Sequence, residues 1–157
     1  MYKASFFLGT FILFFSCQPQ KHESLAAFEV FCEMVANDVK PVALHHPMDS
    51  AAVDAHWPAF EKIAEDWGVN LYREDAFPSS ALFPKPVKDA QHVVVIFKTP
   101  RLQQYLQWKA DQIAADPADE ERQEALARRL GRLLGYGHEG INRLLAQHSG
   151  YRSLASF

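Results

Sequence analysis

Val93-Val94-Val95-Ile96-Phe97 is an unbroken run of apolar residues, most of them β-branched, in the second half of the chain. Its length and composition are typical of a β-strand. Because every position is apolar, neither face of such a strand suits contact with water, and we expect both faces to be covered. The run therefore predicts a buried central strand.

Helical patterns precede this run. The apolar residues that recur at helical spacing are Leu25, Phe28, Cys32, Val35 and Val39. They predict a helix over 24–38. One helical turn is expected over 50–56, and Pro58 is expected at the first position of a further helix that Gly68 ends.

Two further segments before the central run are predicted to be strands. Residues 41–45 are a short apolar stretch that Pro47 closes, and residues 69–73 alternate between apolar and polar side chains. Residues 74–90 contain several prolines and are expected to form a long loop or an irregular hairpin.

Three helices are predicted after the central run. Thr99-Pro100 and Asp116-Pro117 each have the form of a helix start, and Gly135 is placed to end the second of these helices. The last helix is expected over 138–148. The predicted core side of the first is formed by Leu102, Tyr105, Leu106 and Ile113.

The order of these elements predicts one globular domain over residues 24–157. A buried strand among several helices implies a small sheet of two to four strands covered by four or five helices, and the fold ends in an αα-hairpin. The class is therefore α+β or three-layer α/β. A composition of 48% hydrophobic and 22% charged residues is that of a packed domain rather than a disordered chain.

The first seventeen residues, MYKASFFLGTFILFFSC, have the order of a secretory signal. Lys3 provides a short positive region, and an apolar run over 6–15 follows and ends at the small residue Ser16. This run is shorter than the roughly 20 residues that a membrane-spanning helix needs. We expect residues 1–16 to be a signal peptide and residues 17–23 to be a tether.

Phe14-Phe15-Ser16-Cys17 resembles the lipobox of bacterial lipoproteins. Ser16 and Cys17 match the last two positions of that motif, whereas Phe14 stands where leucine is usual and Phe15 is bulkier than the usual residue. The resemblance implies that Cys17 carries lipid, including palmitate, and that the signal is cut just before it. It also implies a membrane-anchored protein of the cell envelope that faces outside the cytoplasm, on the periplasmic side or at the cell surface.

Cysteine usage agrees with this interpretation. Cys17 and Cys32 are the two cysteines of the chain, so an acylated Cys17 leaves Cys32 without a partner for an intramolecular disulfide. Apolar neighbours place Cys32 on the core side of its predicted helix. An inert buried thiol is therefore favoured over a catalytic nucleophile.

Residues 135–140, GYGHEG, match the dinucleotide-binding pattern G-x-G-x-x-G. That motif needs a strand before its glycines, whereas a leucine-rich helix is predicted here. We therefore interpret the segment as a turn between helices and expect no nucleotide and no cofactor. A formal net charge of −3 offers no positive field to nucleic acid, and Arg128 is expected to pair with Glu124 on a solvated helix surface.

The densest group of polar side chains is His45, His46, Asp49, Asp54 and His56. Imidazole and carboxylate groups bind metals and act as acids and bases. The spacing matches no known metal signature, and on a strand His45 and His46 would point to opposite faces. We therefore favour a polar turn. The best candidate for a ligand or metal site is nevertheless His45, His46, Asp49 and His56, because α/β sheets place ligands at the ends of strands and this group follows a predicted strand.

The aromatic residues of the domain offer a second kind of site. Those considered are Trp57, Phe60, Trp67, Tyr72, Tyr105 and Trp108. They could line an apolar pocket for a lipid or glycan, although aromatic residues at helical spacing are more typical of a core.

Two functions are compatible with these patterns. The favoured one is a non-catalytic lipoprotein domain that binds a partner, such as a protein of the envelope, or supports assembly while Cys17 holds it to the membrane. The alternative is a metal-assisted hydrolase that uses the region of His45, His46 and His56.

Overall fold

A computed structural model describes residues 20–83 and 91–152 of the chain, and the predicted signal peptide and Cys17 lie outside these residues. The helices are α1 (Gln20–Ala36), α2 (Ser50–Trp67), α3 (Arg101–Ala114), α4 (Glu120–Leu133) and α5 (His138–Arg152). The strands are β1 (Val42–Leu44), β2 (Met48–Asp49), β3 (Asn70–Glu74) and β4 (Gln91–Phe97). The predicted strands at 41–45, 69–73 and 93–97 are therefore confirmed with small shifts at their ends.

The strand β4 is the centre of the sheet. β1 and β3 pair with the same part of β4, residues 95–97, and therefore lie on opposite sides of it. The N–H of His45 donates to the carbonyl of Val94, so the chain continues along the β1 side to β2. All three are antiparallel to β4, with Val42 and Asn70 both opposite Phe97. The prediction that the apolar run forms the middle of a small sheet is confirmed.

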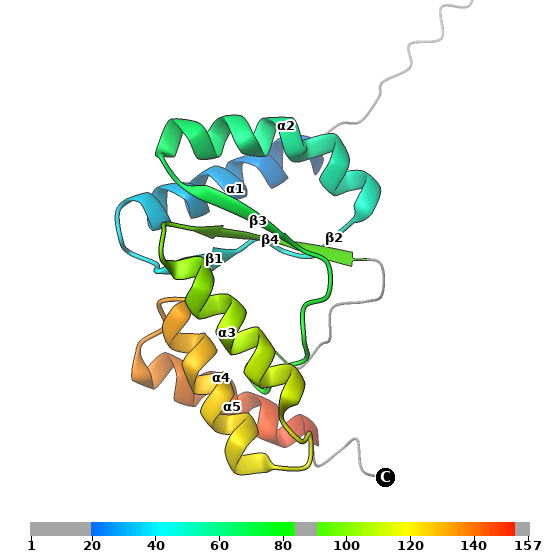
Figure 1. Cartoon of the computed structure of the whole chain (residues 1–157), viewed down its shortest axis with the longest axis vertical. Coiled ribbons are helices and arrows are strands. Elements are labelled where there is room, and N and C mark those ends of the chain that lie inside the picture. Colours follow the sequence, from blue (N-terminus) through cyan, green and yellow to red (C-terminus); the bar gives the residue numbers. More distant parts are fainter. Residues whose placement is uncertain (1–19, 84–90, 153–157) are drawn as a thin grey trace, which may run out of the picture.

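Helices cover both faces of this sheet, as Figure 1 shows. Val94 and Ile96 pack with α1 and α2 in one apolar core. Val95 and Phe97, which point the other way, pack with α3, α4 and α5 in a second core. The molecule is thus an α+β protein of three layers, and the predicted burial of β4 on both faces follows from the alternation of its side chains.

A β-bulge interrupts the edge strand between β1 and β2. Leu44 lies opposite Val95, whereas Met48 lies opposite His92. The edge strand therefore places three residues, 45–47, where β4 has only two. An extra residue bends the strand and redirects the side chains around it, and this bulge carries His45 and His46.

The second helix departs from the prediction. Residues 50–56 and the segment after Pro58 form one continuous helix, α2, with Pro58 inside it. Asp49 starts this helix, because its side chain accepts a hydrogen bond from the N–H of Ala52. Gly68 ends the helix at φ 65°, as predicted.

The third helix also buries a different side from the one predicted. Tyr105 is buried, but Leu106 is 38% exposed and Ile113 is 66% exposed. Trp108 and Gln112 are buried instead. Together with Tyr105 they lie at helical spacing on one side of α3, and this side packs against α4. Trp108 donates a hydrogen bond to the carbonyl of Leu126 on α4.

The starts of α3 and α4 lie later than the two X-Pro signals suggest. Pro100 itself is the residue before α3, and α4 begins at Glu120 after Asp119, whose side chain accepts from the N–H of Arg122. The predicted pair between Glu124 and Arg128 is present.

The segment with the G-x-G-x-x-G pattern is a turn between α4 and α5. A helix precedes its first glycine, as predicted, and Gly135 has φ 79°, a conformation that glycine adopts readily. The strand that a dinucleotide site requires is therefore replaced by α4.

Candidate functional site

A cavity of about 520 Å³ lies at the β1–β2 edge of the sheet, beside the bulge. Its volume is typical of small-molecule sites, which span roughly 300–1,000 Å³. Most of its wall is aliphatic or aromatic. The residues that line it are Phe31, Lys40, Ala43, Leu44, His45, His46, Pro47, Phe77, Phe83, Gln91, Val93, Leu134 and Tyr136.

Separate parts of the fold supply the apolar wall. Leu44 comes from β1, Phe77 and Phe83 come from the segment after β3, and Leu134 comes from the end of α4. Phe77 and Phe83 lie with ring centroids 6.3 Å apart, and Phe77 also contacts Trp108 of the core at 5.8 Å. The wall is therefore held against the core beneath it.

Glu74, at the end of β3, fixes the start of the segment that carries Phe77. Its side chain is fully buried and accepts a hydrogen bond from the N–H of Ala76 at 2.8 Å. The same carboxylate accepts from Lys109 at 2.6 Å and from the hydroxyl of Tyr105 at 2.9 Å. Both partners lie on α3, so Glu74 joins the sheet to that helix beside the cavity wall.

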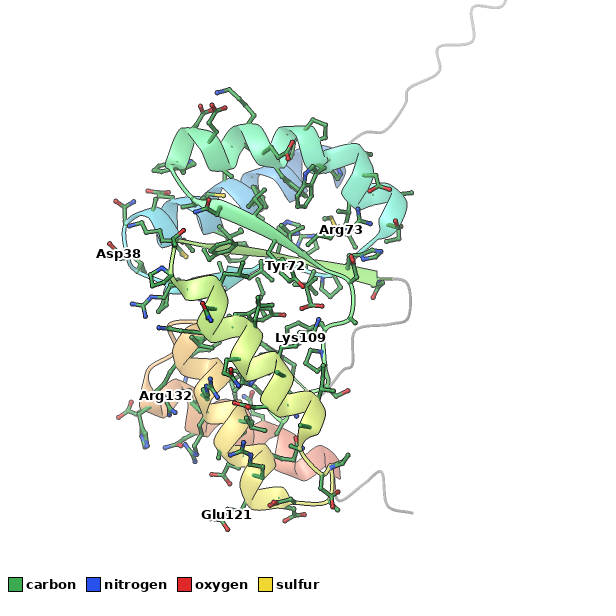
Figure 2. The ribbon with its side chains drawn as sticks, viewed as in Figure 1. Asp38, Tyr72, Arg73, Lys109, Glu121 and Arg132 are labelled. Atoms are coloured by element: carbon green, nitrogen blue, oxygen red, sulfur yellow. The ribbon has the colours of Figure 1, made fainter. Side chains whose placement is uncertain are left out.

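Figure 2 shows how neighbouring side chains of β3 serve opposite layers. Tyr72 packs in the core of α3, α4 and α5, and Lys109 reaches Glu74 from α3. Arg73 instead binds Asp54 on α2 at 2.5 Å.

Burial, followed by the charge of Glu74, holds the pKa of Tyr105 far above its usual range, so this hydroxyl acts as a hydrogen-bond donor.

Lys40 is the cationic side chain of the cavity wall. Its Nζ donates to the carbonyl of Leu134 at 2.9 Å and lies 4.9 Å from the centre of the Tyr136 ring. Leu134 caps the C-terminus of α4, where a positive charge is favourable. Burial lowers the pKa of Lys40, because removal from water disfavours the ammonium form.

The structure brings His45 and His46 together, contrary to the expectation that they point to opposite faces. Their ring centroids lie 3.9 Å apart. The bulge explains the difference, since these residues follow β1 and are not part of a regular strand. His45 is buried against Phe28 and Phe60, whereas His46 is exposed, and both line the cavity.

Asp49 and His56, the other predicted site residues, have local structural roles. Asp49 caps α2, and His56 packs on Phe60 with ring centroids 5.7 Å apart. The ring of Phe60 also contacts His45. Within residues 25–83 and 91–147, no group of three or more histidine, cysteine, aspartate or glutamate side chains is placed to hold a metal ion.

A polar network lies on the face of β3 that is turned towards α2, opposite to the face that carries Glu74. Asp75 accepts from Arg73 at 3.2 Å and contacts Nδ1 of His92 at 2.6 Å. Arg73 also donates to the hydroxyl of Ser50 at 2.9 Å and to Asp54 on α2. This network therefore joins α2, β3 and β4.

The cavity wall differs from the aromatic set considered in the sequence. Phe60, Tyr105 and Trp108 are buried core residues, as their helical spacing favours. The aromatic residues of the wall are Phe31, Phe77, Phe83 and Tyr136. Phe77 and Phe83 lie in the segment that follows β3, where the sequence shows no helical or strand periodicity. The prolines of residues 74–90 were the available indication of an unusual loop, and residues 84–90 lie outside the described part of the chain.

Neither family models, nor curated proteins, nor solved structures yield a match to this chain. Among the helices that the structure describes, none is long and apolar enough to cross a membrane.

Proposed function

We propose that this chain is a lipid-anchored cell-envelope protein whose folded domain binds an apolar ligand in the cavity beside the bulge. The domain acts as a binding module rather than as an enzyme. Cys17 carries the lipid that anchors the chain to the membrane, and the domain lies on the side away from the cytoplasm. The observation that carries the binding role is the cavity of about 520 Å³ with a mostly apolar wall.

The sequence near the N-terminus supports the anchor. Residues 14–17 resemble a lipobox, and α1 begins at Gln20, only a few residues after Cys17. A short tether keeps the domain close to the membrane surface, where apolar and amphiphilic molecules are concentrated. Each methylene group of the lipid chains that is buried in the bilayer adds about 0.8 kcal/mol to the free energy of membrane binding.

The form of the cavity supports ligand binding. The apolar surface of the cavity is presented by Leu44, Phe77, Phe83 and Leu134. The few polar groups of the wall, with Lys40 and His46 among them, can fix the orientation of a ligand. This combination is typical of small-molecule sites.

Photolabelling of the full lipidated chain in nanodiscs tests the proposal. The probe is a neutral alkyl diazirine, and mass spectrometry locates the modified peptides. We expect labelling in residues 40–47 and 77–83 of the wild type. Leu44→Trp places a larger side chain in the cavity and is expected to abolish most of that labelling.

Leu71→Trp is the matched control. Leu71 is also a half-buried leucine on an edge strand, but it packs in the core of α1 and α2. Labelling of 40–47 and 77–83 is expected to persist in this variant. If the wild type is not labelled in these segments, or if Leu44→Trp leaves their labelling unchanged, the cavity does not bind apolar ligands.

The metal-assisted hydrolase is the less well supported function. His45 and His46 lie close together, but Asp49 and His56 are engaged elsewhere. Metal analysis of the purified chain distinguishes the two functions. Stoichiometric zinc that is lost in His46→Ala would favour the hydrolase.

A further inference from the structure

We propose that the ligand is a single-chain amphiphile with an anionic head group, and that Lys40 binds the head group. This inference rests on the proposed function and specifies its ligand. The apolar wall takes the hydrocarbon chain, and the polar edge formed by Lys40, His46 and Gln91 takes the anion.

The surroundings of Lys40 differ from those of the other cations. Every other half-buried lysine or arginine within residues 25–83 and 91–147 pairs with a carboxylate. These residues are Arg73, Lys98, Lys109, Arg128 and Arg129. The partners of Lys40 are a carbonyl group and an aromatic ring, both of them neutral.

An anion near Lys40 would supply the missing countercharge. Its ammonium group has three donors, and the carbonyl of Leu134 accepts from one of them. An anion adds direct attraction between opposite charges to its hydrogen bond, whereas a hydroxyl offers the hydrogen bond alone. A carboxylate or phosphate at this edge therefore binds more strongly than a hydroxyl, and a cationic head group is repelled.

The rest of the wall does not oppose an anion. Among the described residues that line the cavity, none is acidic. His46 is exposed at the edge, and its imidazole can donate a hydrogen bond to an anion in either charge state. Glu74 is the carboxylate nearest to the wall in the chain segment before Phe77, but it does not line the cavity. It is buried and accepts hydrogen bonds from Lys109 and Tyr105.

Competition against the neutral diazirine probe tests the head group. The competitors are dodecanoate, dodecyl phosphate, dodecanol and dodecylammonium, added to the full chain in nanodiscs. In the wild type we expect both anions to displace the probe from residues 40–47 at concentrations on the order of tenfold lower than the alcohol, and the cation to be weakest. The difference between the two anions identifies carboxylate or phosphate as the preferred source.

Lys40→Met removes the charge and keeps an apolar stem, and Lys98→Met is the matched control. Lys98 is a half-buried lysine that pairs with Asp38. The ratio of wild-type to variant competition cancels the partitioning of each competitor into lipid. We expect Lys40→Met to lose the preference for anions, Lys98→Met to retain it, and Lys40→Arg to retain it because the charge is kept.

The outcomes separate this inference from the function on which it rests. Equal competition by all four amphiphiles in the wild type would overturn the anionic head group while cavity binding stands. An unchanged preference for anions in Lys40→Met would overturn the role of Lys40. Absence of probe labelling in the wild type would overturn the proposed function itself. If Lys40→Met does not fold, the wild-type series still decides the head group, provided that the competitors are compared by their free concentrations in water, which removes the difference in their partitioning into lipid.

Discussion

Glu74 shows how one buried charge is accommodated at the centre of this fold. Its carboxylate is removed from water and is compensated by one cation, one hydroxyl and one backbone N–H. A buried carboxylate costs several kcal/mol unless it is paired and hydrogen-bonded. Loss of Lys109 would therefore leave the buried negative charge of Glu74 without its cationic partner.

Lys109→Met is expected to lower the free energy of unfolding by about 3–5 kcal/mol, because it leaves the charge of Glu74 unpaired. The double variant Glu74→Leu with Lys109→Met is expected to regain much of this loss, since no charge then remains buried. Chemical denaturation of the three proteins measures the difference. Equal stability of the single variant and the wild type would show that the pair contributes little.

Cys32 provides a prediction about pH. Burial, with a smaller contribution from Glu29, raises the pKa of its thiol from 9.0 to about 12. A raised native pKa means that the folded state holds this proton more tightly than the unfolded state. The resulting stability is fully present below pH 9 and is lost as the pH rises from 9 towards 12.

Two measurements check this prediction. The native thiol is expected to resist a disulfide reagent at pH 8 and to react after unfolding. The fall in melting temperature above pH 9 is expected to be shallower in Cys32→Ala than in the wild type. Rapid reaction of the native thiol at pH 8 would contradict the burial of Cys32.

At the scale of elements, α2 is the least expected part of the fold. Pro58 is compatible with a helix start, and from local preferences alone a break before it is the simpler interpretation. The structure continues the helix through Pro58 because Val53 and Phe60, on either side of it, are both fully buried in the same core. Tertiary packing thus outweighs a local preference.

Pro58→Ala is expected to stabilise the protein. A proline inside a helix costs about 3 kcal/mol, and the greater freedom of alanine in the unfolded chain offsets up to about 1 kcal/mol of the gain. A net increase of about 2 kcal/mol would raise the melting temperature measurably. Pro47→Ala, in the bulge, is the control and is expected to bring no such gain. A less stable Pro58→Ala protein would mean that Pro58 has a role that its place in α2 does not indicate.

The sequence was sufficient for the elements that repeat a simple period. The apolar run of β4 and the spacing of Phe28, Cys32 and Val35 on α1 predict their structures because burial selects those positions. The bulge at 45–47 could not be predicted, since it depends on which residues of β4 lie opposite. For the same reason the meeting of His45 and His46 was missed.

The candidate site was predicted only in part. His45 and His46 do line the cavity, but Phe77, Phe83 and Lys40 were not among the predicted site residues. Their role arises from contacts between segments that are distant in the chain. Such contacts leave no periodic signal in a single sequence.

At the scale of the whole molecule, β4 is shared by both cores. Val94 and Ile96 belong to one core, and Val95 and Phe97 belong to the other. Damage to this strand is therefore expected to affect both layers of helices at once.

Val95→Asp tests this coupling. It places an unpaired carboxylate at a fully buried position and is expected to cost several kcal/mol, out of a typical total of roughly 5–15 kcal/mol. Tryptophan fluorescence reports both layers, because Trp108 lies in one core and Trp57 and Trp67 border the other. Single-tryptophan versions of the variant are expected to melt together at a lowered temperature. A wild-type melting temperature, or separate melting of the two layers, would contradict the central role of β4.

Cys17→Ser tests the anchor of the whole chain. We expect this change to block both incorporation of radiolabelled palmitate and removal of the signal, and the second effect is visible as a larger protein on a gel. Cys32→Ser is the control and is expected to keep the label. A labelled Cys17→Ser protein, or an unlabelled wild type, would show that Cys17 is not the lipidated residue.

The position of β4 along the chain also bears on the order in which the protein folds. Within the described residues, β1, β2 and β3 each pair with β4, which begins only at Gln91. While the ribosome has produced no more than residues 1–90, these strands have no neighbour to complete the sheet. A nascent chain of this length is left with α1 and α2 and with open strand edges, which favour association with other chains. The sheet can form only after residues 91–97 are free to pair, because they are the neighbour that β1, β2 and β3 share.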